Sequence, residues 1–105
     1  MRHTVRYIGK LHGCGLLIFG PQASVRAEYD FEGFQSLVGQ ITASGEVCLP
    51  PEDLKTVFAH RILQLRAEDG QIFDLRFSRQ ELSPTSDIAH VDLIGNLSSV
   101  SGWAL

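Results

Sequence analysis

The stretch "RILQLRAEDGQIFDLRF", residues 61–77, holds two runs of alternating apolar and polar residues with Asp69-Gly70 between them. Alternation with a period of two is typical of a strand that has one buried face and one exposed face. An Asp-Gly pair between two such runs is a strong signal for a β-hairpin. The stretch therefore predicts two antiparallel strands joined by a tight turn.

The length of the hairpin loop follows from the need to keep apolar side chains on one face. A two-residue turn would set Leu65 opposite Asp74 and would mismatch every later pair. A three-residue loop over 68–70 sets Leu65 opposite Phe73 instead. That loop is a type I turn closed by a left-handed residue, a conformation that Gly70 adopts without steric cost. We therefore predict a three-residue loop with a bulge at Gly70.

Alternation recurs along the rest of the chain. Val25, Ala27, Tyr29 and Phe31 alternate with polar residues, as in an antiparallel strand that covers a core. Further strands are expected at about 4–12, 14–20, 37–48 and 87–95, and the glycines at 13 and 15 are expected to form a turn and a bulge.

The segment "PPEDLKTVFAH", residues 50–60, departs from this alternation. Pro51 suits the first helical position, and acidic residues in the first turn interact favourably with the helix dipole. Leu54, Val57 and Phe58 then fall on one helical face. We expect a short helix near 51–59 that lies over an open end or edge of the sheet.

Together these segments predict one β-rich domain over residues 1–105, since 44% apolar and 20% charged residues are typical of a globular chain. The fold class is mainly β: an antiparallel rolled sheet, barrel-like or sandwich-like, of about seven strands with one short helix. The chain's own side chains should fill the interior, namely Phe19, Tyr29, Phe31, Leu63, Leu65, Phe73, Leu75, Val91 and Leu93.

The compartment is inferred from what the sequence lacks. No apolar run reaches the roughly 18 residues of a membrane span, and no secretory signal is evident at the start of the chain. We expect a cytoplasmic protein without a membrane partner. Cys14 and Cys48 fit a reducing compartment as free thiols, but the sequence leaves a disulfide between them open.

The order of segments resembles that of small, uncharacterised bacterial β-rich proteins. The likeness rests on "VRAEYDF", "GQITASGEV", the Pro-acidic helix, the 61–77 hairpin and "AHVDLIGNL", and it covers roughly residues 13–97. It implies a β-rich fold. The resemblance implies no activity and identifies no functional residue.

The chain offers few groups for catalysis or metal binding. His12 and Cys14 are two residues apart on an expected strand, and Cys48, His60 and His90 complete a candidate donor set for zinc. The paired ligands at short spacing that structural zinc sites use are absent, and so are a nucleophile elbow and a phosphate-binding loop. We expect no metal, no cofactor and no enzymatic activity, with these side chains scattered over the exterior.

Charged residues on the outer faces are the candidate interaction residues. Arg61, Arg66, Arg76 and Arg79 lie on or beside the hairpin, as a solvated face or as a basic patch for an acidic partner. The net charge of −3 and the lack of exposed aromatic residues for base stacking disfavour nucleic acid.

An acidic run lies on another expected strand. Glu28, Asp30 and Glu32 share its outer face and are placed to meet the arginines, either within the sheet or between two copies in a symmetric dimer. Trp103 either caps the core or anchors an interface, and we expect it to pack on the parent chain.

These features favour a non-enzymatic binding or assembly module that acts through the outer sheet face, the edges or the loops. The loop over 78–87 is the longest polar connection and suits a partner, because loops on rigid scaffolds often carry function. Two alternatives stay open: a small-ligand carrier with a pocket at one end of the sheet, and nucleic-acid binding through the arginines.

Overall fold

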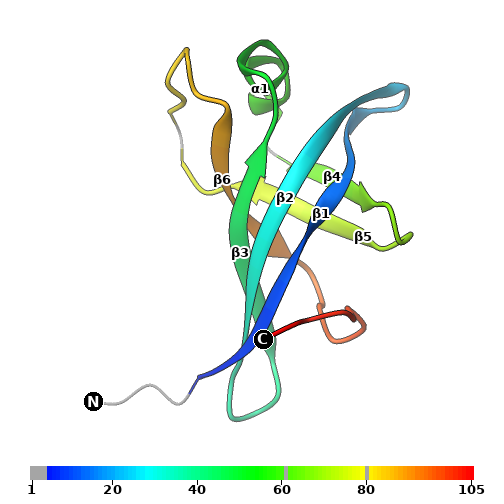
Figure 1. Ribbon diagram of the computed structural model, residues 1–105, viewed down its shortest axis with the longest axis vertical. Helices are drawn as coiled ribbons and strands as arrows, with labels where there is room; N and C mark the ends of the chain where they lie inside the picture. The colour runs from blue at the N-terminus through cyan, green and yellow to red at the C-terminus, as the bar shows by residue number, and fades with distance from the viewer. Residues whose placement is uncertain (1–4, 61, 80) are drawn as a thin grey trace.

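The computed structural model describes residues 5–60, 62–79 and 81–105, whose six antiparallel strands form a closed barrel (Figure 1). Around the barrel the strands follow the order β1-β2-β3-β6-β5-β4, and β4 pairs again with β1. In chain order the elements are β1 (Arg6–Gly20), β2 (Ala23–Gln35), β3 (Ile41–Cys48), α1 (Pro51–Phe58), β4 (Ile62–Ala67), β5 (Ile72–Phe77) and β6 (Ile88–Ile94). The prediction of a mainly β, barrel-like sheet with one short helix is confirmed.

The hairpin of β4 and β5 has the predicted register. Leu65 pairs with Phe73. The Ala67 N–H donates to the Gln71 carbonyl at 2.9 Å, and the Gly70 N–H donates to the Ala67 carbonyl at 3.0 Å. Gly70 has φ +94°, the left-handed conformation that closes a three-residue loop. The predicted loop length and the role of Gly70 are therefore confirmed.

The glycine-rich segment near the start of the chain does not turn. β1 runs unbroken through Gly13 and Gly15, so the two separate strands and the turn expected there are wrong. Both glycines are sites of close approach, a common use of glycine within a strand. A Cβ on Gly13 would lie 3.1 Å from the Tyr29 hydroxyl, and one on Gly15 would lie 2.5 Å from the Arg66 carbonyl oxygen.

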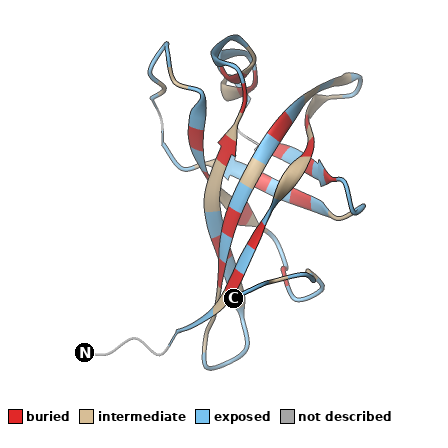
Figure 2. Ribbon diagram, in the orientation of Figure 1, coloured by how far each residue is buried: buried red, intermediate tan, exposed pale blue. Residues whose placement is uncertain are grey.

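The barrel interior is filled by apolar side chains, as the alternating burial along each strand shows (Figure 2). Seven of the nine predicted interior residues are buried, and the other two, Phe19 and Tyr29, are partly buried against the core. The rings of Phe31 and Phe73 meet edge to face with their centroids 5.8 Å apart. Packing alone therefore accounts for the inward face of the hairpin.

Two different segments cover the two ends of the barrel (Figure 1). Helix α1 covers one end, and its Leu54 and Val57 have no exposed surface. At the opposite end Trp103 packs against the core, as expected. The next residue, Ala104, bridges to Lys10 of β1 through two backbone hydrogen bonds of 2.8 and 3.0 Å.

Candidate functional site

Strand register gathers polar side chains from four strands into rows on the outer face of the barrel. Asp30 of β2 pairs with His12 of β1 and with Glu46 of β3, and Glu46 pairs with His90 of β6. Paired positions on adjacent strands place their Cβ atoms about 4.5–5.5 Å apart. Two carboxylates therefore lie side by side between two imidazoles.

Neighbouring rows add further acidic and thiol groups. Glu28 pairs with Cys14 on one side and with Cys48 on the other, and Glu32 pairs with Lys10. We call Glu28, Asp30, Glu32 and Glu46 the acidic face. These four side chains come from the middle of two adjacent strands, so the barrel itself fixes their spacing.

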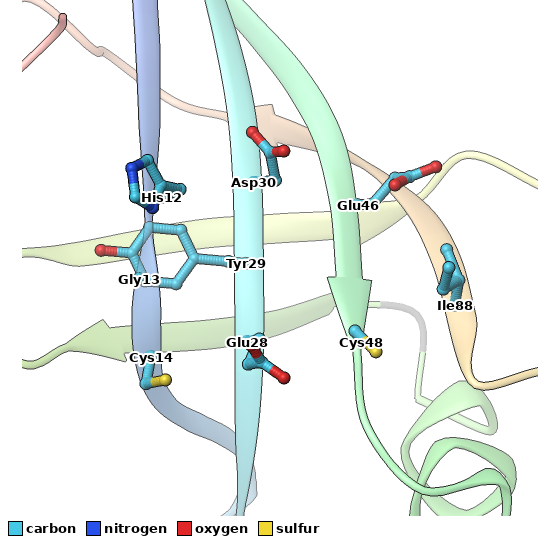
Figure 3. A pocket seen from close by; sticks show the side chains of 9 residues that line it. All are labelled: His12, Gly13, Cys14, Glu28, Tyr29, Asp30, Glu46, Cys48 and Ile88. Carbon is cyan, nitrogen blue, oxygen red and sulfur yellow. The ribbon is translucent and has the colours of Figure 1, made fainter.

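The acidic face borders two shallow hollows. The first, of about 490 Å³, is lined by Glu28, Asp30 and Glu46 together with His12 and both cysteines (Figure 3). The second, of about 550 Å³, shares Asp30 and Glu46 with the first and is also lined by Glu32, Lys10, Arg79 and His90. Together they make this part of the outer face concave, and neither hollow extends into the filled interior of the barrel.

Most of the acidic face lacks a charged partner. Between described residues, two ion pairs are shorter than 4.0 Å: His90 Nδ1 to Glu46 Oε2 at 3.8 Å and Arg76 to Asp92 at 3.7 Å. Glu28, Asp30 and Glu32 take part in neither. Three neighbouring carboxylates on one strand therefore project toward solvent without an ion pair shorter than 4.0 Å to a described residue, although Lys10 and Arg79 line the second hollow beside Asp30 and Glu32.

The predicted arginine residues lie in different surroundings. Arg66 sits near the hairpin loop, paired with Ile72, whereas Arg76 forms its ion pair with Asp92. Arg79 lines the second hollow with the acidic face, and Arg61 lies outside the described residues. The structure thus brings one of the three described arginines to the acidic run.

The two cysteines are both free, which answers the question that the sequence left open. They flank Glu28 on either side, so two strand spacings of about 4.8 Å separate them, too far for a disulfide. Burial raises the pKa of the Cys48 thiol, and the carboxylates of Asp87, Glu28 and Glu46 raise it further. The protonated thiol is a weak nucleophile and a poor metal ligand.

The expectation that histidines and cysteines are scattered is wrong for three of them. His12, Cys14 and Cys48 line the same hollow. Over the described ranges, however, no three His, Cys, Asp or Glu side chains are close enough together to hold a metal ion. His60 is elsewhere, with its ring centroid 5.4 Å from that of Phe19.

The sequence revealed the acidic residues of β2 but not Glu46, and it did not place His90, a candidate zinc ligand, beside them. Alternation identified the outer residues of each strand, yet it carries no information on which strands pair. The pairing of β3 with β6, which are far apart in the chain, brings Glu46 and His90 together.

Comparison with known proteins adds no homologue, because no family model, curated protein or solved structure matches the chain. The resemblance to small bacterial β-rich proteins stays an expectation. Within the described ranges, no helix has the length and apolar character needed to cross a membrane.

Proposed function

We propose that this protein is a non-enzymatic binding module that recognises a basic segment of a protein partner through its acidic face. The observation that carries the proposal is that Glu28, Asp30 and Glu32 form no ion pair with any residue that the structure describes, although they project side by side from one strand. Neighbouring carboxylates of this kind attract and orient a positively charged partner.

The shape of the region supports the same proposal. The two hollows follow the acidic face over four strands, which suits an extended segment that lays several side chains across them. Such a segment would place lysine or arginine side chains between the carboxylates. The filled interior gives less support to a ligand carrier, and the separation of Arg66, Arg76 and Arg79 gives less support to nucleic-acid binding.

The proposal is tested with a fluorescein-labelled peptide of alternating lysine and serine, measured by fluorescence anisotropy. The unaltered protein should bind it, and added salt should weaken binding because the contacts are exposed. Replacing three carboxylates by amides, E28Q/D30N/E32Q, should weaken binding about ten- to hundredfold.

A matched control changes the net charge by the same amount elsewhere. Glu68, Asp74 and Glu81 are exposed acidic residues that line neither of the two hollows. The variant E68Q/D74N/E81Q should retain most of the affinity, because only the overall charge changes. Equal losses in the two triple variants, or no binding by the unaltered protein, would refute the proposal.

A further inference from the structure

The connection between β2 and β3 places two aliphatic side chains in the centre of a tight turn. The Gly39 N–H donates to the Ser36 carbonyl at 2.9 Å, and Gly39 has φ +89°. Leu37 and Val38 occupy the central positions and are 80% and 88% exposed. Turn centres favour Gly, Pro, Asn, Asp and Ser, so neither turn geometry nor core packing accounts for these two residues.

The turn is held in place from both of its flanks. The Gln40 N–H donates to the Ser36 hydroxyl at 3.2 Å, and the Gln35 side-chain amide donates to the Gly39 carbonyl at 3.3 Å. The Ser36 N–H also donates to the Gln40 carbonyl at 2.9 Å. The aliphatic pair is therefore presented in a fixed position, which reduces the entropy that binding would cost.

More apolar surface lies beside the turn, on β1. Tyr7 pairs with Phe34, the two ring centroids are 5.4 Å apart, and Val5 precedes them with 52% of its surface exposed. We call Val5, Tyr7, Leu37 and Val38 the apolar tip. Exposed apolar groups gathered in this way mark interaction sites more often than chance exposure does.

Among the described residues, Arg6 supplies the charge at the apolar tip. Residues 33–45 contain no charged residue, and the next charged residue along β1, Lys10, pairs with Glu32. Arg6 lies at the tip and donates to the Gln35 side-chain oxygen at 2.8 Å. Glu32, which accepts a 3.5 Å hydrogen bond from the Tyr7 hydroxyl, marks the border with the acidic face.

The shape of the tip favours a flat partner. The β2–β3 connection lies at one end of the molecule's longest dimension, which measures 40 Å, and it projects beyond the neighbouring strands (Figure 1). A projecting tip needs a matching pocket in a protein partner but none in a lipid surface. A second copy packed tip to tip would bring the two Arg6 side chains together, and that repulsion disfavours self-association.

We propose that the apolar tip docks reversibly on an anionic lipid surface. Leu37 and Val38 enter the boundary between headgroups and acyl chains, where a small apolar insertion gives weak binding. Tyr7 lies at headgroup level, and Arg6 contacts lipid phosphates. The proposal does not depend on the acidic face, which uses other residues.

Co-sedimentation with vesicles tests the proposal. Vesicles of phosphatidylcholine containing about one third phosphatidylserine should bind the protein, and vesicles of phosphatidylcholine alone should bind it less. The variant L37S/V38S should reduce partitioning into the anionic vesicles about tenfold. R6Q should reduce it about threefold to fivefold.

The control removes two exposed aliphatic side chains elsewhere. Ile72 and Ile88 are 58% and 42% exposed, so I72S/I88S should bind vesicles as the unaltered protein does. E28Q/D30N/E32Q removes negative charge near the tip, so it should bind anionic vesicles at least as well as the unaltered protein, which separates this result from the test of the acidic face. No binding of the unaltered protein, or equal losses in the two serine variants, would overturn the proposal. If L37S/V38S altered only self-association, as measured by sedimentation equilibrium, and left vesicle binding unchanged, that result would also overturn the proposal. It would favour a second copy of the chain as the partner.

Discussion

The indole ring of Trp103 lies directly on the backbone of Gly33 at one end of the barrel. A Cβ on Gly33 would come within 2.7 Å of the six-membered ring. Gly33 pairs with Gly9, on which the backbone of Ala104 lies. The indole N–H is buried without a hydrogen bond among the described residues, so the contact stabilises the fold through packing. The paired residues Gly9 and Gly33 thus form the surface on which residues 103 and 104 pack, and we call this surface the glycine seat.

Replacing Gly33 with alanine should displace the indole ring and destabilise the protein by about 1–3 kcal/mol, the usual range for overpacking a core. Urea denaturation gives the free energy of unfolding. The control is Gly20→Ala, whose Cβ would meet only the Ala23 Cβ at an ordinary 3.5 Å. Equal stability of the two variants would show that Trp103 does not depend on this seat.

Gly45→Ala should be more destabilising than Gly13→Ala. The Cβ on Gly45 would lie 2.0 Å from the carbonyl oxygen of Asp30, which is backbone within a paired strand and cannot move away cheaply. At Gly13 the nearest atoms belong to the Tyr29 side chain, at 3.1 Å or more, and a ring can shift. We expect a loss of about 3 kcal/mol for G45A and about 1 kcal/mol for G13A, measured by thermal and urea unfolding. The reverse order would contradict this account of the close approach between Gly45 and the backbone of β2.

The hairpin loop should weaken in acid because of Asp69. Its carboxylate accepts hydrogen bonds from the Gln71 backbone N–H at 3.0 Å and from the Gln71 side chain at 2.9 Å, and these lower its pKa below the ordinary 3.8. A lowered pKa means that the stabilisation is present above pH 3.8 and is lost as the pH falls through the folded pKa. Carboxyl ¹³C NMR should give the shifted pKa, and the protection factor of the Gln71 amide, which corrects for the intrinsic pH dependence of exchange, should fall below it. If the Asp69 carboxyl group titrated at its ordinary pKa, the hydrogen bonds from Gln71 to the carboxylate would be ruled out.

The Cys48 thiol should react slowly. Burial and three nearby carboxylates raise its pKa above 9.0, so less thiolate is present at pH 8 than in a free cysteine. In Cys14→Ser, which leaves Cys48 as the sole cysteine, alkylation by iodoacetamide should be slower than in urea-unfolded protein. Adding Glu28→Gln should accelerate it, because one carboxylate is removed. A folded-state rate equal to the unfolded rate would exclude the raised pKa.

Sequence patterns predicted the elements that depend on neighbouring residues. The 61–77 hairpin was predicted correctly because alternation, turn residues and register all lie within one short stretch. The break expected at Gly13 and Gly15 was wrong because their neighbours in space, Tyr29 and the Arg66 backbone, lie far along the chain. The sequence alone does not distinguish a glycine that ends a strand from a glycine that lets a neighbouring strand or side chain pack closely against it.

The same limit applies to the candidate site. Glu28, Asp30 and Glu32 could be assigned to one face because they alternate within one strand. Their relation to Glu46, His90 and the two cysteines depends on the pairing of four strands. That pairing follows from closure of the whole barrel, so it has no local sequence signal.

The bridge between Lys10 and Ala104 has a consequence for biosynthesis, because it joins positions 94 residues apart (104 − 10). While the chain emerges from the ribosome, β1 can pair early with β2, but the glycine seat stays empty until residue 104 has left the exit tunnel. Completion of this end of the barrel therefore waits until residues 103 and 104 have been translated. A nascent chain stalled before Trp103 would leave that end of the barrel open to chaperones and proteases.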